Sequence, residues 1–281
     1  MDLTGRICVV TGGASGIGRA LCHRFAGERA GAVVVVDRDA DGAVATARAV
    51  GAQATPMTAD VTVEADIQAV VARTEAEVGP IDLFASNAGV LGGGGIEASD
   101  DAWERAWRVN VLAHLYAARA VVPLMLERGG GHLLSTASAA GLLTQPGDAP
   151  YSVTKHAAVA LAEWLSMTYG DQGIGVSCAC PMAVATAMLG FPEGTEGPAV
   201  PPAGGPGMGA AAVQGILPPA AVAEAVVEGL RQERFLILPH PEVATFERRR
   251  AADHDRWLAG MRRLNRTLAD GSPAGSTPTV P

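Results

Sequence analysis

The sequence predicts an α/β protein built on one doubly wound parallel sheet of about seven strands, flanked by helices in a single domain. Three observations indicate this fold. Short runs rich in Val, Ile and Ala alternate with amphipathic segments along most of the chain. Such runs are typical of strands that are buried on both faces. A glycine-rich loop joins the first run to the first amphipathic segment, and no repeat or linker divides the rest of the chain.

The first βαβ unit is expected between residues 7 and 37. Residues 7–10 and 32–37 are the two apolar runs, and Ile17, Leu21 and Phe25 recur between them at every fourth position. That spacing places one apolar stripe along a helix. The glycine loop therefore opens a notch at the start of a helix, where free backbone N–H groups and the helix dipole favour a phosphate group.

The later elements continue the same alternation. Helices are expected at 43–50, 67–78, 99–128, 151–170, 220–231 and 242–268, and strands at 53–57, 81–85, 132–136, 174–179 and 235–238. The segment after Pro181 is rich in Gly, Pro and Ala, so we expect a long mobile excursion with a substrate lid at about 182–219. The resulting organisation is a catalytic domain at 1–240, followed by a C-terminal helix and a polar tail at 241–281.

Composition narrows the choice of partners and compartment. The net charge of −8 argues against nucleic acid or an anionic membrane surface as a partner. The sequence has neither a run of eighteen apolar residues nor an N-terminal basic and apolar leader, so we expect no membrane span and no secretory signal. The four cysteines have neither a disulfide-rich pattern nor the spacing of a metal site, which favours a cytoplasmic protein that binds no metal.

The residue that ends the second apolar run indicates the cofactor. Asp37 lies nineteen positions after Gly18, where a carboxylate accepts hydrogen bonds from the hydroxyl groups of an adenosine ribose. Because this carboxylate would repel a 2′-phosphate, we expect NAD rather than NADP. Arg19 and Arg38 keep NADP open, since either guanidinium can pair with a phosphate. A sheet of this kind with a dinucleotide notch is Rossmann-like.

A second group of residues carries acid–base chemistry. Tyr151 and Lys155 lie four positions apart on an expected helix, so their side chains share a face. A phenol with a pKa near 10 is a poor base at neutral pH. We expect the ammonium of Lys155, together with a cationic nicotinamide ring, to lower the pKa of Tyr151. Tyr151 then exchanges a proton with an alcohol while a hydride moves to or from the cofactor.

With these residues in view, the chain resembles the short-chain dehydrogenase/reductase family from about Leu3 to Leu238. The motifs that carry the resemblance are, in order, the cofactor loop Thr11-Gly12-x-x-x-Gly16-x-Gly18, the adenine-contacting pair Asp60-Val61, the sheet-stabilising Asn87-Ala88-Gly89, the catalytic Asn110 and Ser138, Tyr151-x-x-x-Lys155, and the segment 181–186 beside the nicotinamide. One residue departs from the pattern. Met182 stands where the family commonly has glycine, and it should fill space near the nicotinamide or the substrate.

The resemblance implies a role for each catalytic residue. Ser138 would donate a hydrogen bond to the substrate oxygen, and Tyr151 would be the general acid/base. Lys155 would lower the pKa of Tyr151 and bind the nicotinamide ribose, and Asn110 would hold a water that links Lys155 to solvent as a proton relay. The structural alternatives are a turn cap for Ser138 and a backbone-bonding role for Asn110. The notch and the resemblance together give the cofactor-binding set Gly12, Ser15, Gly16, Ile17, Gly18, Asp37, Arg38, Asp60, Val61, Asn87, Ala88, Gly89, Tyr151, Lys155, Pro181, Val184 and Thr186.

Substrate specificity is expected from residues 91–96, from residues 142–149 and from the excursion after Pro181. The candidates for the pocket wall are the apolar Leu142, Leu143, Met182, Met188, Leu189 and Phe191 and the polar Gln145 and Asp148. An alternative places the apolar residues in the core of a lid and the polar ones on a loop surface. These segments carry no cationic cluster, which favours a neutral, mainly apolar small molecule over a phosphorylated or CoA-linked one.

The C-terminal helix is rich in Arg, but acidic residues are interspersed, so we expect a solvated or subunit-facing helix. The family resemblance implies a homotetramer, or else a homodimer.

Three functions remain open on these grounds. The first is an NAD-dependent alcohol dehydrogenase or carbonyl reductase that interconverts a secondary alcohol and a ketone. The second is an NADPH-dependent ketoreductase acting on acyl thioesters, which Asp37 and the acidic net charge oppose, because acyl carrier proteins are themselves acidic. The third is a catalytically silent NAD(H)-binding scaffold, which the complete set of catalytic residues opposes.

Overall fold

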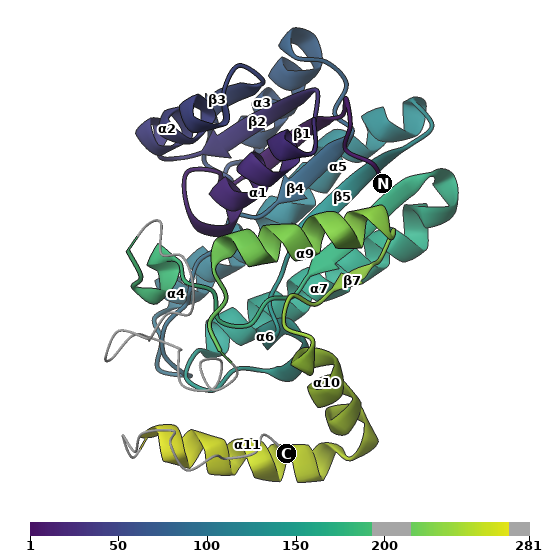
Figure 1. Cartoon of the computed structure of the whole chain (residues 1–281). Coiled ribbons are helices and arrows are strands. Elements are labelled where there is room, and N and C mark those ends of the chain that lie inside the picture. The colour runs from purple at the N-terminus through teal and green to yellow at the C-terminus, as the bar shows by residue number, and fades with distance from the viewer. Residues whose placement is uncertain (193–214, 270–281) are drawn as a thin grey trace.

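The computed structural model describes residues 1–192 and 215–269. They form one seven-stranded sheet in the order β3-β2-β1-β4-β5-β6-β7, with every neighbouring pair parallel (Figure 1). The strands are β1 (Ile7–Thr11), β2 (Ala32–Asp37), β3 (Ala54–Thr58), β4 (Leu83–Ser86), β5 (Gly131–Thr136), β6 (Ile174–Ala179) and β7 (Leu236–Ile237). This architecture confirms the predicted fold class.

The order of the strands determines where a ligand can bind. The chain moves outward from β1 through β2 to β3, and then crosses back to β4 on the other side of β1. At such a switch point the loops that follow the two strands diverge and leave a crevice at the carboxyl ends of the strands. The residues that follow β1 and β4, namely 12–16 and 87–91, therefore form the edges of the site.

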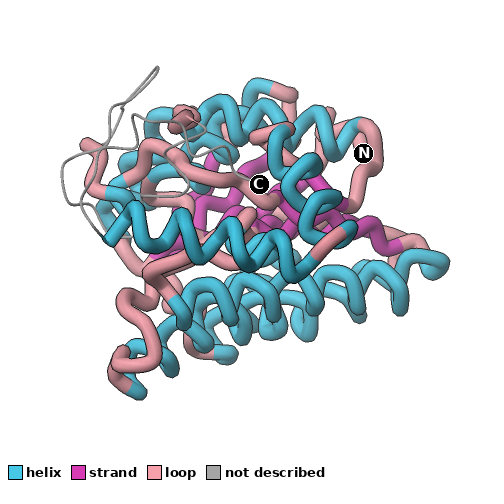
Figure 2. Tube along the Cα trace, turned by 90° about the horizontal axis from the view of Figure 1, so that it is seen from below, coloured by secondary structure: helices cyan, strands magenta, loops and turns pink. Residues whose placement is uncertain are grey.

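Helices cover both faces of the sheet, as Figure 2 shows from below. The helices on one face are α1 (Gly16–Gly27), α2 (Ala40–Val50) and α9 (Pro219–Arg231), and those on the other are α3 (Glu64–Glu77), α5 (Ala113–Glu127) and α7 (Ala149–Tyr169). The valines of β2 show why the strands are apolar throughout. Val33 and Val35 pack with α1 and α9, while Val34 and Val36 pack on the opposite face, and all four are fully buried.

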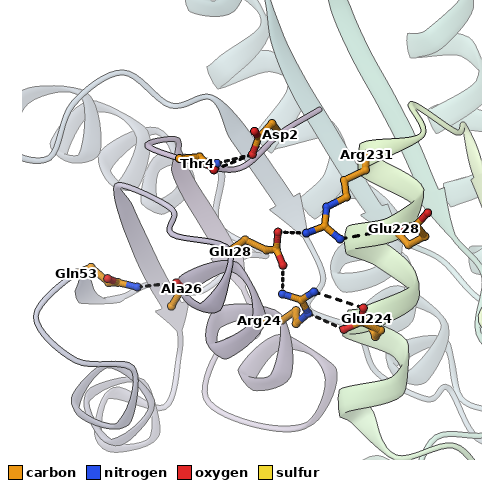
Figure 3. A network of polar contacts seen from close by, with 9 residues as sticks. All are labelled: Asp2, Thr4, Arg24, Ala26, Glu28, Gln53, Glu224, Glu228 and Arg231. Atoms are coloured by element: carbon orange, nitrogen blue, oxygen red, sulfur yellow. Dashed lines mark hydrogen bonds and ion pairs between the residues drawn. The ribbon is translucent and has the colours of Figure 1, made fainter.

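Helices α1 and α9 are also joined by charges at their edges (Figure 3). Arg24 of α1 pairs with Glu28 and also with Glu224 of α9, at 2.7 Å between Nε and Oε2. Arg231 of α9 pairs with Glu28 in turn. A single exposed ion pair contributes little, but Glu28 is mostly buried and is shared by two guanidinium groups, so this network helps to fix α9 against α1.

Three elements differ from the sequence-based expectation. The helix expected at 99–128 is divided into α4 (Asp100–Trp107), a π-helical turn η1 (Arg108–Leu112) and α5. The loop expected after β5 contains a single helical turn, α6 (Ala140–Leu143). The C-terminal helix is two helices, α10 (Glu242–Ala252) and α11 (His254–Ala269). Asp253 separates them because its backbone is extended, with φ −153° and ψ 91°, and its carboxylate accepts a hydrogen bond from the Arg256 amide at 3.0 Å.

The excursion after β6 leaves the fold and returns to it at neighbouring points. A short helical turn, η3 (Ala187–Leu189), ends its first segment. The amide of Ala185 donates to the Leu217 carbonyl at 2.9 Å, and the amide of Leu217 donates to the Ala183 carbonyl at 3.1 Å. The central part of the expected lid, 193–214, and the tail from residue 270 onward lie outside the described residues.

One helical stretch in the described part of the chain, Asp100–Glu127, is long and apolar enough to cross a membrane by length and composition alone. Half of its most apolar window is buried within the protein, and α5 packs against α3, β4 and β5. This packing is that of a core helix.

Candidate active site

A cavity of about 790 Å³ opens at the carboxyl ends of the strands, at the switch point between β1 and β4. Its lining extends from the β1–α1 loop and the end of β2, past the ends of β4, β5 and β6, to helices α7, α10 and α11. This volume is within the usual range for cofactor and substrate sites. The cavity has two ends, one formed by the first βαβ unit and the other by segments after β5.

The N-terminus of α1 faces the first end of the cavity. Ser15, Gly16 and Ile17 all line it. Ser15 is the N-cap residue, yet its side chain makes no capping hydrogen bond within the described residues, and no acidic side chain occupies the first turn. The first amides of a helix have no partner in their own helix, so these donors and the positive end of the helix dipole are free to bind an anion such as a pyrophosphate.

Glycines bring the loop and the helix close together. Gly12 has φ +68°, and a Cβ there would lie 2.9 Å from the Cα of Ala88. A Cβ on Gly18 would lie 2.0 Å from the carbonyl oxygen of Gly12. Gly18, a predicted cofactor residue, is not among the described residues that line the cavity; it lets α1 pack on the loop that does. The notch is therefore shaped by backbone, which only glycine permits at these positions.

Asp37 lies at the far side of the notch, at the end of β2. Its Oδ2 accepts from the amide of Ala14 at 3.0 Å, and its Oδ1 accepts from the amide of Asp39 at 3.1 Å. The guanidinium of Arg19 bonds to neighbouring protein groups: Nε donates to Thr46 Oγ1 at 3.1 Å, and Nη2 donates to the Ala14 carbonyl. Arg38 is exposed and lines the cavity. The carboxylate is thus held in place by backbone donors at the end of the notch where an adenosine ribose is predicted to bind.

The predicted adenine-contacting pair and the Asn-Ala-Gly motif also line this end. Hydrogen bonds from the Thr62 amide and hydroxyl, with the charge of Arg38 adding a smaller contribution, lower the pKa of Asp60, so its carboxylate is ionised. Asn87 donates from Nδ2 to the carbonyl of Thr11 at 3.0 Å, which ties β4 to β1. Pro181, Val184 and Thr186 complete the wall from the β6 side.

Ser138, Tyr151 and Lys155 meet in the middle of the cavity, where the two ends join. Tyr151 and Lys155 lie one turn apart on α7, and the Lys155 Nζ is 5.6 Å from the centre of the Tyr151 ring. Lys155 Nζ donates to the carbonyl of Thr136 at 3.0 Å. Ser138 Oγ accepts from the Ala140 amide at 3.1 Å and donates to the Pro181 carbonyl at 3.4 Å, so the serine has local backbone partners while it lines the cavity beside Tyr151.

Asn110 lies behind this group, on the π-helical turn η1. Its Oδ1 accepts from the amide of Val90 at 3.0 Å, and its Nδ2 donates to the Val90 carbonyl at 2.9 Å and to Thr154 Oγ1 at 3.1 Å. The side chain therefore holds the segment after β4 against α7. A Cβ on Gly89 would lie 3.4 Å from both Asn110 Oδ1 and Lys155 Nζ, so the two side chains border the same small space. A π-helical turn at such a place is a frequent feature of functional sites.

Burial shifts the pKa values of Tyr151 and Lys155, the two predicted catalytic groups on α7. Desolvation raises the pKa of Tyr151, and a hydrogen bond with Ser138 lowers it by less. Desolvation also lowers the pKa of Lys155 to about 8. The expectation of a lowered tyrosine pKa joins Lys155 with a cationic nicotinamide ring, and it stays a prediction for the protein with a dinucleotide bound. Burial outweighs the ammonium, which bonds to Thr136 and is easier to deprotonate than a lysine in water.

Asp148 has a larger part in the site than the sequence indicates. From the sequence, Asp148 is expected either in the pocket wall or on a loop surface. The structure buries it at the start of α7. Its Oδ1 accepts from the Tyr151 amide at 2.9 Å, and its Oδ2 accepts from the amides of Gly92 and Gly93 at 3.1 and 3.0 Å. One carboxylate thus caps the helix that carries Tyr151 and fixes the glycine loop over it. The only sequence signal is an Asp three residues before a helical Tyr, which is an ordinary N-cap pattern.

The second end of the cavity is formed by side chains. Gln145, Met182 and Met188 line it, as predicted, together with Leu143 and Leu189. Leu142 and Phe191 are placed otherwise: Leu142 is buried in the main hydrophobic core, and Phe191 packs in a small cluster at the base of the excursion. Leu143 is buried in the same core as Leu142, and of the two only Leu143 also lines the cavity.

Two contributions to this end are absent from the sequence-based expectation. His240, after β7, accepts a hydrogen bond on Nδ1 from the amide of Met182 at 3.1 Å and so fixes the start of the excursion. Phe246 of α10 and Trp257, Met261 and Leu264 of α11 line the cavity. The expectation that the C-terminal helix is solvated or faces another subunit is wrong for its apolar face, which covers this end of the cavity.

Comparisons with known proteins agree with this geometry. A family model described as short chain dehydrogenase matches residues 6–194. The 1-deoxy-11-beta-hydroxypentalenate dehydrogenase of Streptomyces exfoliatus is 42% identical over 210 residues, covering 70% of this chain and 75% of that protein. Estradiol 17-beta-dehydrogenase 11 of Mus musculus is 33% identical over 209 residues, covering 72% and 70%. A solved structure from Burkholderia phymatum, a short chain dehydrogenase/reductase in complex with NAD, has a TM-score of 0.79 and 31% identity, covering 91% of this chain and 96% of its own.

Proposed function

The chain belongs to the short-chain dehydrogenase/reductase family, and on that premise we propose that it is an NAD(H)-dependent enzyme that interconverts a secondary alcohol and a ketone. The observation that carries the proposal is the meeting of Ser138, Tyr151 and Lys155 at the point where the dinucleotide notch joins an apolar pocket. The notch fits a dinucleotide because α1 presents uncapped amides and Asp37 stands at the adenosine end. A bound nicotinamide would supply the acceptor or donor of a hydride.

The side chains supply the proton chemistry. In alcohol oxidation, the phenolate of Tyr151 takes the hydroxyl proton as the carbon–hydrogen bond gives up its hydride. In ketone reduction, the phenol returns that proton to the carbonyl oxygen. Ser138 donates a hydrogen bond to the same oxygen and orients it, and Lys155 binds the nicotinamide ribose. Asn110 holds the segment after β4 so that the space beside Lys155 stays open to a relay water.

The raised pKa of Tyr151 affects the direction of the reaction. Burial keeps the free enzyme's tyrosine in its phenol form at neutral pH, which is the form that ketone reduction uses. Alcohol oxidation uses the phenolate, so it requires a higher pH or the positive charge of an oxidised nicotinamide nearby. We therefore infer that the site is better prepared for reduction at neutral pH.

NAD is proposed over NADP on the position of Asp37. Its carboxylate is held by the amides of Ala14 and Asp39, so a 2′-phosphate would meet a fixed negative charge, and Arg19 is engaged with Thr46 and the Ala14 carbonyl. Replacing Asp37→Ser is expected to lower the preference for NADH over NADPH by about 30-fold, the effect of roughly 2 kcal/mol of charge repulsion. Steady-state rates with both cofactors measure this ratio. An unchanged ratio would refute this choice of cofactor.

The proposed reaction is tested by Tyr151→Phe, which removes the hydroxyl and keeps the ring. We expect the kcat for alcohol and ketone turnover to fall by about 10²–10⁴-fold, while the dissociation constant for NADH stays within about threefold. The assay follows NADH absorbance in both directions over a panel of alcohols and ketones. Full activity in the variant would exclude Tyr151 as acid/base, and no turnover of any panel member by the native enzyme would favour a silent NAD(H)-binding scaffold.

The proposed substrate is a neutral, mainly apolar small molecule. Leu143, Met182, Met188 and Leu189 give the second end of the cavity an apolar wall. The relatives named for a hydroxypentalenate and for estradiol support a secondary alcohol on a largely hydrocarbon frame. Turnover restricted to highly anionic compounds would contradict this proposal.

We also propose that the chain assembles with copies of itself, as a tetramer or a dimer. Trp164 and Met167 of α7 are 52% and 78% exposed, and Trp107 of α4, a helix that contacts α7, is exposed as well. Such large exposed apolar side chains are typical of a surface that a partner covers. Light scattering measures the molar mass in solution of the native chain and of the Met167→Asp variant. A monomer in the native protein would contradict the proposal.

A further inference from the structure

The C-terminal helices α10 and α11 form a feature that the proposed reaction does not require. Helix α10 packs against α6, the turn that follows Ser138. Val243 and Phe246 of α10 are buried in the main core, and the Phe246 ring contacts the ring of Trp257 at 6.3 Å between centroids. The indole of Trp257 is only 2% exposed. Helix α11 is thus anchored at its first turn to the body of the protein, next to the catalytic serine.

The two faces of α11 differ in character. Trp257, Met261 and Leu264 are spaced by four and three residues, so they share one face, and all three line the cavity. The opposite side carries the exposed Arg256, Arg262, Arg263 and Arg266. In Figure 1, α11 is the yellow helix below α6 and α10. An amphipathic helix buries its apolar face against whatever it covers, and here that is the substrate end of the cavity.

The substrate end of the cavity is lined by apolar and uncharged polar side chains. The lining residues contributed by α6, by the loop to α7, by residues 181–189 and by α10 and α11 include no ionisable side chain in the described part of the chain. The ionisable residues that line the cavity come from the cofactor end, from α7 and from α4 with η1. On α4 and η1, Arg108 pairs with Glu104, and Arg105 donates to the Leu91 carbonyl at 3.2 Å.

We propose that α11 is the substrate-selecting wall of this enzyme, and that it favours a bulky hydrocarbon body, fused-ring or branched, over a short-chain alcohol. The proposal rests on the proposed function and adds the size class of its substrate. Trp257, Met261 and Leu264 line the substrate end of the cavity, where Met261 is partly exposed and the buried Trp257 and Leu264 support it, so a substrate reaches this wall only if it extends beyond the reacting carbon. A short alcohol leaves that surface in contact with water, so it gains nothing from α11.

The test compares one bulky and one small substrate on matched variants. Leu264→Ala removes part of the wall, and Leu258→Ala is the control, because Leu258 lies on the same helix but is 42% exposed and does not line the cavity. The substrates are 2-decalol and 2-butanol, each assayed with NAD. We expect Leu264→Ala to lower the ratio of kcat/KM for 2-decalol over 2-butanol by about tenfold, mainly through the KM for 2-decalol. The control should leave this ratio unchanged.

Circular dichroism and thermal melting establish that both variants fold. The proposal is overturned if the ratio is unchanged in folded Leu264→Ala, if Leu258→Ala lowers it equally, or if the native enzyme turns over 2-butanol as efficiently as 2-decalol.

A binding measurement separates this proposal from the proposed reaction. Titrating the NAD-loaded protein with 2-decalone should quench the tryptophan emission of the native chain, and Trp257→Phe should remove at least half of that quench. If the quench is lost in Trp257→Phe but no alcohol is ever oxidised, the wall exists and the reaction is wrong. If alcohols are oxidised but the quench is the same in both proteins, the reaction stands and the role of α11 is wrong.

Discussion

The two ends of the cavity are built in different ways. At the cofactor end, much of the lining is loop backbone: Gly12 and Gly16 have positive φ, Ser15 is the N-cap residue of α1, and Ala88 and Gly89 follow β4. At the substrate end the lining is large side chains such as Met182, Met188 and Trp257, carried by segments that are far apart in the sequence. The shape of the first end depends on close backbone approaches that a Cβ would block. The shape of the second end depends on which side chains come together there. The first therefore tolerates almost no substitution, whereas the second can change its shape and keep the fold.

The most severe test of this contrast is Gly18→Ala. The added Cβ would lie 2.0 Å from the carbonyl oxygen of Gly12, so α1 cannot keep its place on the loop. We expect NADH binding to weaken by more than about 100-fold, as measured by fluorescence titration. Gly27→Ala is the control on the same helix, since the nearest atom to its Cβ would be Arg24 Nη1 at 4.0 Å. Native affinity in Gly18→Ala would show that the notch does not depend on this approach.

Asp148 connects the helix that carries Tyr151 to the glycine loop, in the region between the two ends of the cavity. Changing Asp148→Ala leaves the amides of Tyr151, Gly92 and Gly93 without their acceptor, at roughly 1–3 kcal/mol for each one that stays buried. We expect kcat to fall by about 30-fold because Tyr151 and the glycine loop lose their common anchor. Asp171→Ala, at an exposed site, is the charge-matched control. Asp148→Asn should recover part of the loss through its remaining acceptor. Equal rates in Asp148→Ala and the native enzyme would remove Asp148 from the site.

The pH dependence of turnover tests Tyr151 and Lys155, which lie between the two ends of the cavity. Because burial raises the pKa of Tyr151, the phenolate fraction grows with pH throughout the neutral range, and kcat/KM for alcohol oxidation should rise about tenfold per pH unit from pH 6. Ketone reduction uses the phenol and should be level there. It should decline above about pH 8, where Lys155 loses the proton that gives it its charge. An oxidation rate that is level between pH 6 and 8 would mean that the phenol is already ionised in the NAD-bound enzyme, and that burial does not control its titration there.

The mildest change is expected at the substrate end. Met182→Gly removes a side chain from the cavity wall, while its amide can still donate to His240. We expect kcat/KM for bulky alcohols to change by only about threefold and NADH affinity to stay the same, because the wall is made of several side chains from separate segments. A loss of NADH affinity as large as that in Gly18→Ala would erase the contrast between the two ends.

The same contrast explains how much the sequence could predict. The first βαβ unit is a local pattern in which glycine spacing, apolar periodicity and Asp37 occur within about thirty residues, and the structure has β1, α1 and β2 there. The triplet Ser138, Tyr151 and Lys155 could be recognised because helix spacing and motif order constrain it. The structure brings all three to one cavity.

The remaining features depend on contacts between distant segments. The turn of α6 is only four residues long, too short for a periodicity to show. The break at Asp253 has a local signal, a capping Asp three residues before Arg256, but the surrounding charged sequence is equally suited to one continuous helix. The spacing of Trp257, Met261 and Leu264 indicates an apolar face and says nothing about what that face covers. Burial of Tyr151, which raises the pKa of its phenol in the protein without a dinucleotide, is likewise a property of the assembled site.

The charged contact between α1 and α9 has a consequence for how the chain folds. Arg24 and Glu224 are 200 residues apart, and the helix that carries the glycine notch has its outer surface covered by one of the last elements to be made. At a synthesis rate of about 5–20 residues per second, an interval of about 10–40 s separates the appearance of the two helices. During that interval the part of α1 that faces α9 has no final partner on the nascent chain, although β1, β2 and α2 already contact the helix. The contact between α1 and α9 is therefore completed late, and a chain stopped before α9 would leave the ribosome with this part of α1 open to aggregation.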